Sequence, residues 1–148
     1  MPYAVFASLA LFMGVLLATY LPVLSQSGRL VGSPILANVP FYFFGLVTSA
    51  MLAVAAGNRM DDFARLRELP GWMFLTGVVS ALMILGSTFL IPRIGPGAFF
   101  VLLVAGQIMT GAVLSHMGWL GAPVDAIGLR KLAGLGLVML GTGLVAWR

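Results

Sequence analysis

Two side-chain amides lie within long uncharged stretches of the sequence, and they are the residues best suited to bind a polar solute. Gln107 falls in the middle of AFFVLLVAGQIMTGAVLS, residues 98–115, which contain no charged side chain. Asn38 lies in a second apolar stretch, residues 35–56. An amide carries two donor hydrogens and an acceptor oxygen, more groups than its own helix easily satisfies. Each amide therefore needs a partner, either a neighbouring helix or a bound solute.

Uncharged polar and small residues recur at helical spacing around both amides. A spacing of i, i+4, i+7 places residues on one face of an α-helix. The faces formed in this way are Asn38, Tyr42, Gly45 and Ser49; Thr76, Ser80 and Ser87; and Gln107, Thr110, Gly111 and Ser115. The residues that we expect to bind a solute are Gln107, Asn38, Tyr42, Thr76 and Ser80. The alternatives are that the amides hold helices together and that the hydroxyls bond carbonyls of their own helices.

No catalytic or metal-binding pattern accompanies the amides. The sequence has no cysteine and one histidine, so it offers no thiolate ligand, thiol nucleophile or histidine cluster. Asp61, Asp62 and Glu68 fall in the hydrophilic segment 57–71, where a solvated connector explains them better than a metal site. His116 ends an apolar stretch, where an interfacial anchor or a cap is a better explanation than a proton relay. We therefore expect no enzyme activity, no cofactor and no metal.

The polar residues must be positioned by helices that cross a membrane. Of the 148 residues, 61% are hydrophobic and 8% are charged, and the mean hydropathy is +1.10. A soluble domain is about 25% charged, so lipid must cover most of this surface. Apolar stretches that approach the length of a membrane helix, about 20 residues, occur at about residues 3–23, 35–56, 72–91, 98–115 and 129–147. The sequence predicts an all-α integral membrane protein with five transmembrane helices in a single domain, residues 1–148.

Proline and serine residues mark the expected ends of these helices. Ser33 is a favourable N-cap and Pro34 suits the first helical position, so the second helix is expected to begin there. Pro22 and Pro92 are expected to end the first and third helices. Pro40 falls inside the second helix, where it leaves one carbonyl without its helical donor.

The cationic side chains are distributed almost evenly between the two sides of the membrane. Arg59, Arg65, Arg67, Arg130 and Lys131 share the side of the amino terminus, against Arg29, Arg93 and Arg148 on the other side. This excess places the amino terminus in the cytoplasm, but a chain inserted in both orientations has the same small bias, so both topologies stay open. The cations lie at loop ends, where anionic lipid head groups rather than nucleic acid are the expected partner. In the largest loop, Phe63, Leu66 and Leu69 predict a short interfacial helix.

Glycines in the last apolar stretch predict a contact between helices. Gly134 and Gly141 are seven residues apart, as are Gly136 and Gly143, and this spacing is about two helical turns. Each pair leaves one side of the helix smooth, so that another backbone can come close. We expect this helix to join two halves of an assembly rather than to line a solute path. The alternative is that glycine is simply common in membrane helices.

Several motifs resemble those of a known transporter family. They are RLVGSPILANVPFYFFG at the start of the second helix and IPRIGPGAFFVLLVAGQIMTGAVLSHMGWLG before a basic pair and a glycine-rich last helix. In this order they resemble the five-helix, YdcZ-like (EamA-like) branch of the drug/metabolite transporter superfamily. The similarity covers almost the whole chain and is strongest over residues 90–148. The chain departs from that pattern in LPVLSQSG, where relatives often carry an asparagine, and at Ser115, which replaces an acidic residue.

The resemblance implies one half of a ten-helix transporter that consists of two five-helix repeats of opposite orientation. Transporters with inverted repeats bind their solute near the membrane midplane, between the halves. A five-helix chain then needs a second copy or a paralogous chain in the opposite orientation, in a bacterial inner (plasma) membrane. We expect a transporter of small metabolites or amphiphilic solutes that works by alternating access as an antiparallel homodimer or heterodimer. The alternative is a non-transporting membrane scaffold or accessory protein whose polar residues only pack helices.

Overall fold

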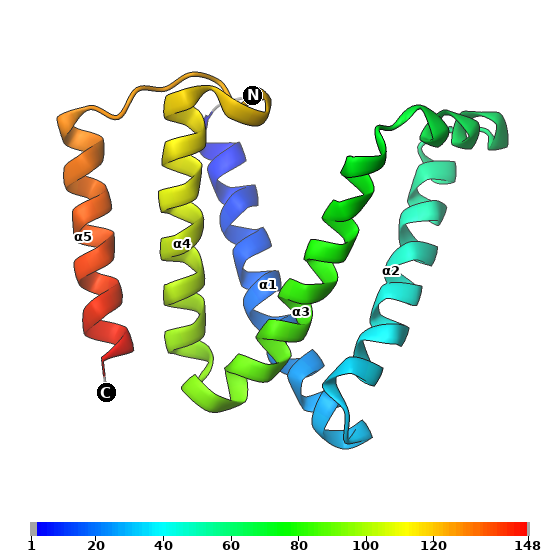
Figure 1. Cartoon of the computed structure of the whole chain (residues 1–148), viewed down its shortest axis with the longest axis horizontal. Helices are drawn as coiled ribbons and strands as arrows, with labels where there is room; N and C mark the ends of the chain where they lie inside the picture. The colour runs from blue at the N-terminus through cyan, green and yellow to red at the C-terminus, as the bar shows by residue number, and fades with distance from the viewer. Residues whose placement is uncertain (1–2, 148) are drawn as a thin grey trace. The chain divides into compact units, whose positions relative to one another are not determined.

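The computed structural model describes residues 3–147 as a series of helices with short connections (Figure 1). In chain order they are α1 (Tyr3–Val31), α2 (Pro34–Ala55), the 3₁₀ helices η1 (Met60–Glu68) and η2 (Gly71–Phe74), α3 (Leu75–Ile94), α4 (Pro96–Met117), η3 (Trp119–Gly121) and α5 (Leu129–Ala146). Within the described residues, five helical segments are long and apolar enough to cross a membrane. The predicted fold class, an all-α membrane protein with five spanning helices, is confirmed.

The chain divides into two compact units, Met1–Pro92 and Arg93–Arg148.

The turn between α1 and α2 follows from three consecutive residues. Gly32 has a φ of +75°, a left-handed conformation that glycine adopts without steric cost. Ser33 is the N-cap of α2, and its Oγ accepts a hydrogen bond from the Leu36 N–H at 3.3 Å. Pro34 takes the first helical position. An N–H at this position has no acceptor within the helix, so its absence in proline costs no hydrogen bond. The predicted start of the second helix is confirmed.

The expectation that Pro22 and Pro92 end their helices is wrong. α1 continues past Pro22 to Val31, and α3 likewise continues past Pro92. A proline removes one backbone hydrogen bond, but packing on either side of it can hold a membrane helix together. Leu21 and Leu24 supply this packing around Pro22, since both are buried. The first helix is therefore 29 residues long and exceeds the predicted span.

Three helices of the first unit meet in a closely packed region, which we call the crossing. It comprises the buried residues Leu21, Leu24, Ser25 and Gly28 of α1, Ala37 of α2, and Ile84, Ser87, Thr88 and Ile91 of α3. A Cβ atom placed on Gly28 would lie 3.2 Å from Pro34 Cα and 3.3 Å from Thr88 Cγ2. Ser25 Oγ donates a hydrogen bond to the Thr88 carbonyl at 3.2 Å. Backbone proximity and a hydrogen bond thus hold α1 against both of its neighbours.

Replacing Gly28 by leucine is expected to lower the melting temperature of the protein. The new side chain would have to displace the Pro34 backbone, and overpacking of this kind costs about 1–3 kcal/mol. Gly14 on the same helix has no atom within 4 Å of a Cβ position, so Gly14→Leu is the matched control. Thermal unfolding in detergent, followed by circular dichroism, measures both variants. Equal melting temperatures would contradict close packing at Gly28.

The hydrophilic connection between α2 and α3 contains the short helix that the sequence predicts, in the 3₁₀ form. The Arg59 N–H at the start of η1 donates to Asp62 Oδ2 at 2.8 Å. Residues three apart share a face of a 3₁₀ helix, and Phe63 and Leu66 line a small cavity together with the end of α2. Asp62 thus stabilises the start of a connector. Over residues 3–147, no three His, Cys, Asp or Glu side chains form a group that could hold a metal ion.

In the second unit, α4 and α5 lie side by side and run in opposite directions (Figure 1). α4 ends at Gly118, which adopts a left-handed conformation with a φ of +64° and donates its N–H to the Leu114 carbonyl. The chain then returns through η3 and an extended loop to Leu129. Thr142 is buried in α5, whereas Leu137 and Leu144 are largely exposed, as suits a helix that faces lipid or another chain.

Candidate functional site

The fold brings together two of the predicted solute-binding residues. Tyr42 of α2 and Ser80 of α3 are 38 positions apart in the sequence, yet Tyr42 Oη and Ser80 Oγ form a hydrogen bond at 2.9 Å. Each hydroxyl has one hydrogen and two lone pairs, so the pair keeps one hydrogen for a further partner. Thr76, one turn before Ser80, donates its hydroxyl hydrogen to the Met73 carbonyl at 2.6 Å. Thr76 therefore offers only acceptor lone pairs to a solute.

An aromatic-lined groove lies between α1 and α2, and neither Tyr42 nor Ser80 is among the residues that line it. Its volume is about 750 Å³, within the range of small-molecule sites, about 300–1,000 Å³. Tyr20 and Phe41 line it and stack with their ring centroids 5.8 Å apart. Phe41 in turn contacts the Tyr42 ring edge to face at 5.1 Å. Among the described residues that line the groove, none is charged, so the groove suits the apolar body of a solute.

Tyr20 is a groove residue that the sequence pattern does not single out. On α1 it shares a helical face with Leu24, Ser27 and Val31, which also line the groove. A tyrosine in a membrane helix usually indicates an interfacial position. The helical spacing of Tyr20 with its neighbours on α1 is also found on any packed helix face, so it does not identify a groove. The stacking on Phe41 identifies the residue only once the helices are placed.

Asn38 lies one helical turn before Tyr42 on the same face of α2. Its side-chain oxygen Oδ1 is buried, and no donor in the described part of the chain reaches it. An unpartnered buried polar group costs about 1–3 kcal/mol. Among residues 3–147, the Oδ1 acceptor of this amide therefore has no hydrogen-bond partner.

Gln107 belongs to the second unit, where its side chain is exposed on α4. With Leu103 and Thr110 it lines an open groove of about 560 Å³ on that helix. No hydrogen bond joins its amide to any residue between 3 and 147. The amide is therefore available to a partner, and the two units carry the predicted site residues separately.

Several hydroxyls of the predicted polar faces are bonded within their own helices. Such bonds to the carbonyls of residues i−3 or i−4 join Ser49 to Gly45, Thr76 to Met73 and Ser87 to Ile84. For these residues the structure supports the structural explanation of the pattern rather than solute binding.

The four glycines that are predicted to form an interface lie on open surface of α5. A Cβ placed on any of Gly134, Gly136, Gly141 and Gly143 would meet no atom within 4 Å. Gly134 also lines a groove of about 420 Å³ between α4 and α5. Nothing in the second unit occupies the smooth sides of the helix, so a second helix has room to approach.

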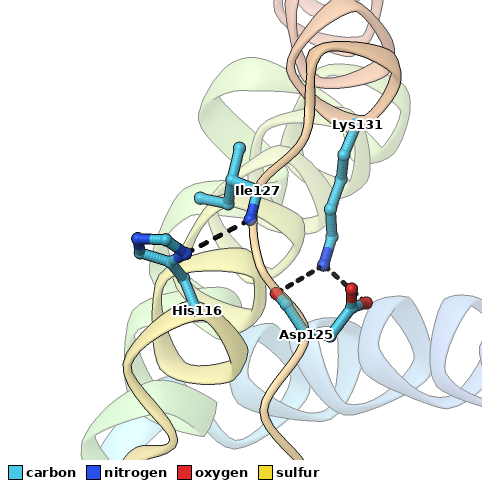
Figure 2. A network of polar contacts seen from close by, with 4 residues as sticks. All are labelled: His116, Asp125, Ile127 and Lys131. Carbon is cyan, nitrogen blue, oxygen red and sulfur yellow. Dashed lines mark hydrogen bonds and ion pairs between the residues drawn. The ribbon is translucent and has the colours of Figure 1, made fainter.

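Polar contacts around His116 hold the loop between α4 and α5 (Figure 2). His116 Nδ1 accepts a hydrogen bond from the Ile127 N–H at 3.2 Å. Lys131 Nζ donates to Asp125 Oδ2 at 2.7 Å and to the Asp125 carbonyl at 3.3 Å. The Asp125 N–H donates to the Ser115 carbonyl at 2.9 Å. His116 thus fastens the loop before α5 to the end of α4 through its hydrogen bond with the Ile127 N–H.

Comparison with known proteins identifies a family. A family model described as "Putative inner membrane exporter, YdcZ" matches residues 5–144, which extend from α1 into α5. No curated protein and no solved structure matches the chain significantly.

Proposed function

Because the chain belongs to the YdcZ family, we propose that it exports small metabolites or amphiphilic solutes across the inner membrane. The observation that carries the proposal is the uncharged groove of about 750 Å³ with Tyr20 and Phe41 in its wall. Lining of this kind favours a neutral or zwitterionic solute, or an amphiphile, because it contains no fixed charge to select an ion. Aromatic faces can additionally attract a cationic head group.

The polar part of the solute is proposed to contact the amides and hydroxyls of the predicted site. Its members are Asn38, Tyr42, Thr76, Ser80 and Gln107. The exposed amide of Gln107 and the spare hydroxyl hydrogen of the Tyr42–Ser80 pair support this assignment. Their groups donate and accept hydrogen bonds without carrying charge, in agreement with an uncharged groove.

We further propose that the active form is an antiparallel dimer, of two copies or of this chain and a paralogous one, that works by alternating access. Support comes from the near balance of cationic residues between the two membrane sides. The open glycine surface of α5 provides a place for the second chain. In such an assembly the solute site lies between the two chains, near the midplane.

Flux measurements in proteoliposomes test the transport proposal against the scaffold alternative, which the self-bonded hydroxyls favour. Purified protein is reconstituted and assayed with a panel of labelled neutral metabolites, zwitterions and aromatic amines. Flux above that of protein-free vesicles for at least one compound is expected. If folded protein yields no flux with any compound in either direction, the scaffold alternative is preferred.

Single cysteines at positions 2 and 148 are expected to label from opposite sides of the membrane. The sequence has no cysteine of its own, so each introduced thiol reports one position. An impermeant maleimide is applied to intact cells and to inverted vesicles. Labelling of each position from both sides indicates dual topology. Labelling of both positions from the same single side would contradict an odd number of spans.

A further inference from the structure

The groove between α4 and α5 has a polar end and an apolar end. Both helices belong to the second unit, and the volume of the groove is about 420 Å³. Ser115 in the last turn of α4 and Lys131 in the first turn of α5 line one end. Ile108 and Val138, about two helical turns deeper in the membrane, line the other end. The groove is therefore amphipathic along its length, as a lipid molecule is.

The length of the groove confines it to one leaflet of the membrane. On each helix the two ends of the groove are seven residues apart. This separation corresponds to roughly 10 Å, at a rise of about 1.5 Å per residue, whereas half of a membrane's hydrocarbon core is about 15 Å thick. A membrane helix of a second chain extends through both leaflets, but a lipid molecule occupies only one. The groove length therefore favours a lipid as its occupant.

Lys131 can bind an anion at the polar end of the groove. Its ammonium group has three hydrogens, and it donates to Asp125 Oδ2 at 2.7 Å and to the Asp125 carbonyl at 3.3 Å (Figure 2). One hydrogen stays available, and the Lys131 side chain is 32% exposed. Ser115 adds a hydroxyl that can also donate. Because Arg130 precedes Lys131, this end carries two cations against the single carboxylate of Asp125.

A second copy of opposite orientation brings no acidic side chain to this membrane surface. With five spans, the acidic residues of the sequence all lie in connections on the side of the amino terminus: Asp61, Asp62, Glu68 and Asp125. In the inverted copy these connections lie at the other surface, and the side chains that take their place are the cations Arg29, Arg93 and Arg148. An anion for Lys131 is therefore supplied by the membrane rather than by an antiparallel partner.

We infer that the groove between α4 and α5 binds an anionic phospholipid, with its phosphate at Lys131 and Ser115 and an acyl chain between Ile108 and Val138. Basic pockets between membrane helices are typical binding sites for anionic head groups. The sequence predicts only that cations lie near head groups, whereas the groove assigns one bound lipid to one of them. This site shares no residue with the proposed solute site, so lipid binding does not depend on transport.

Two lipids that differ only in their head groups test the assignment on the purified, full-length chain. Dioleoylphosphatidylglycerol and dioleoylphosphatidylcholine are added in equal amounts in detergent, and native mass spectrometry measures which of them the protein retains. The anionic lipid is expected to be retained at least about fivefold more than the zwitterionic one, the ratio that corresponds to about 1 kcal/mol for one basic residue at a membrane surface. Glycerol 3-phosphate has the phosphate without acyl chains and is expected not to bind at the same concentration.

Three substitutions then assign this preference to Lys131. Lys131→Gln is expected to abolish it. Arg130→Gln removes the same charge from a residue that does not line the groove, so this matched control should leave the preference almost unchanged. Asp125→Asn breaks the ion pair but leaves Lys131 in place, and it is expected to retain or strengthen the preference because a competing carboxylate has been removed.

Several results would overturn the inference. Equal retention of the two lipids, or equal losses in Lys131→Gln and Arg130→Gln, would mean that no specific head-group site exists. A loss in Asp125→Asn as large as that in Lys131→Gln would assign the effect to the loop that the ion pair holds. Binding of glycerol 3-phosphate as strong as that of the lipid would indicate a site for a soluble anion. Retention by the monomer alone, with loss from the dimer, would identify the second copy as the occupant.

Ser115→Ala keeps the test decisive if Lys131→Gln does not fold. It removes the second donor of the polar end and leaves the ion pair between Lys131 and Asp125 intact. The variant is expected to lower the preference for the anionic lipid while its melting temperature without lipid stays at the parental value. An unchanged preference in this variant would contradict the placement of the phosphate.

Discussion

Gln107→Leu is expected to reduce transport about five- to 150-fold while the protein still folds. The Gln107 amide is exposed on α4 and has no partner among residues 3–147, so leucine breaks no hydrogen bond inside the chain. A solute group that loses its partner in the bound state costs about 1–3 kcal/mol, and each 1.36 kcal/mol is a factor of ten in rate. The loss should therefore appear in transport and not in stability.

The measurement is efflux of a transported solute from proteoliposomes, together with the melting temperature in detergent. Met109→Leu, an apolar exchange at a neighbouring exposed position of α4, is the control. It should leave both quantities unchanged. Hydrogen bonds that only hold membrane helices together are worth about 0.6 kcal/mol on average. Full transport by Gln107→Leu would therefore exclude a recognition role and leave such packing as the explanation.

Gly136→Leu and Gly141→Leu are expected to lower the dimer fraction strongly without unfolding the monomer. A Cβ at either position meets no atom within 4 Å, so each leucine fits on the surface of the isolated chain. Between two chains, however, the leucine would separate backbones that must lie close together. Burial of apolar surface contributes little to the association of helices that already lie in lipid. The added leucine side chain therefore cannot compensate for the close backbone packing that is lost.

Single-molecule photobleaching in detergent or in vesicles measures the dimer fraction. Ala98→Leu, at the start of α4, adds a comparable side chain away from the glycines and is the control. We expect the control to dimerise like the parent and both glycine variants to be mainly monomeric at the same density. Dimerisation of both glycine variants at the parental level would place the interface on another helix.

The helices could be predicted from the sequence largely because their signals are local. The length of the apolar stretches alone reveals the five spanning segments. The start of α2 is equally local, because its N-cap Ser33 and its first residue Pro34 both belong to the turn. Pro22 and Pro92 mislead because a proline ends a helix only where nothing else supports it. The packing that supports α1 around Pro22 comes from residues distant in sequence, such as Thr88 on α3. A local rule contains no information about that contact.

The candidate site could be predicted only in part, for a related reason. Helical spacing places Asn38 and Tyr42 on one face, and it places Thr76 and Ser80 on another, but it cannot pair Tyr42 with Ser80. That pairing depends on how α2 and α3 approach each other. The unmet oxygen of Asn38 is still harder to foresee, because it results from where all neighbouring donors point. Tyr20 enters the site through its contact with Phe41 alone.

The two-residue turn at Gly32 and Ser33 joins the end of α1 directly to the start of α2. Helices joined so tightly cannot separate at the joined end, and there the close contact of Gly28 with Pro34 acts as a pivot. A relative motion of α1 and α2 would have to be a change of the angle between them, and it would change the width of the groove that they line. Packed contacts resist displacement near the pivot, whereas the far ends expose side chains such as Phe6 and Leu52. A change of the angle at Gly28 would therefore alter the distance between the far ends of α1 and α2 more than the distance at the joined end.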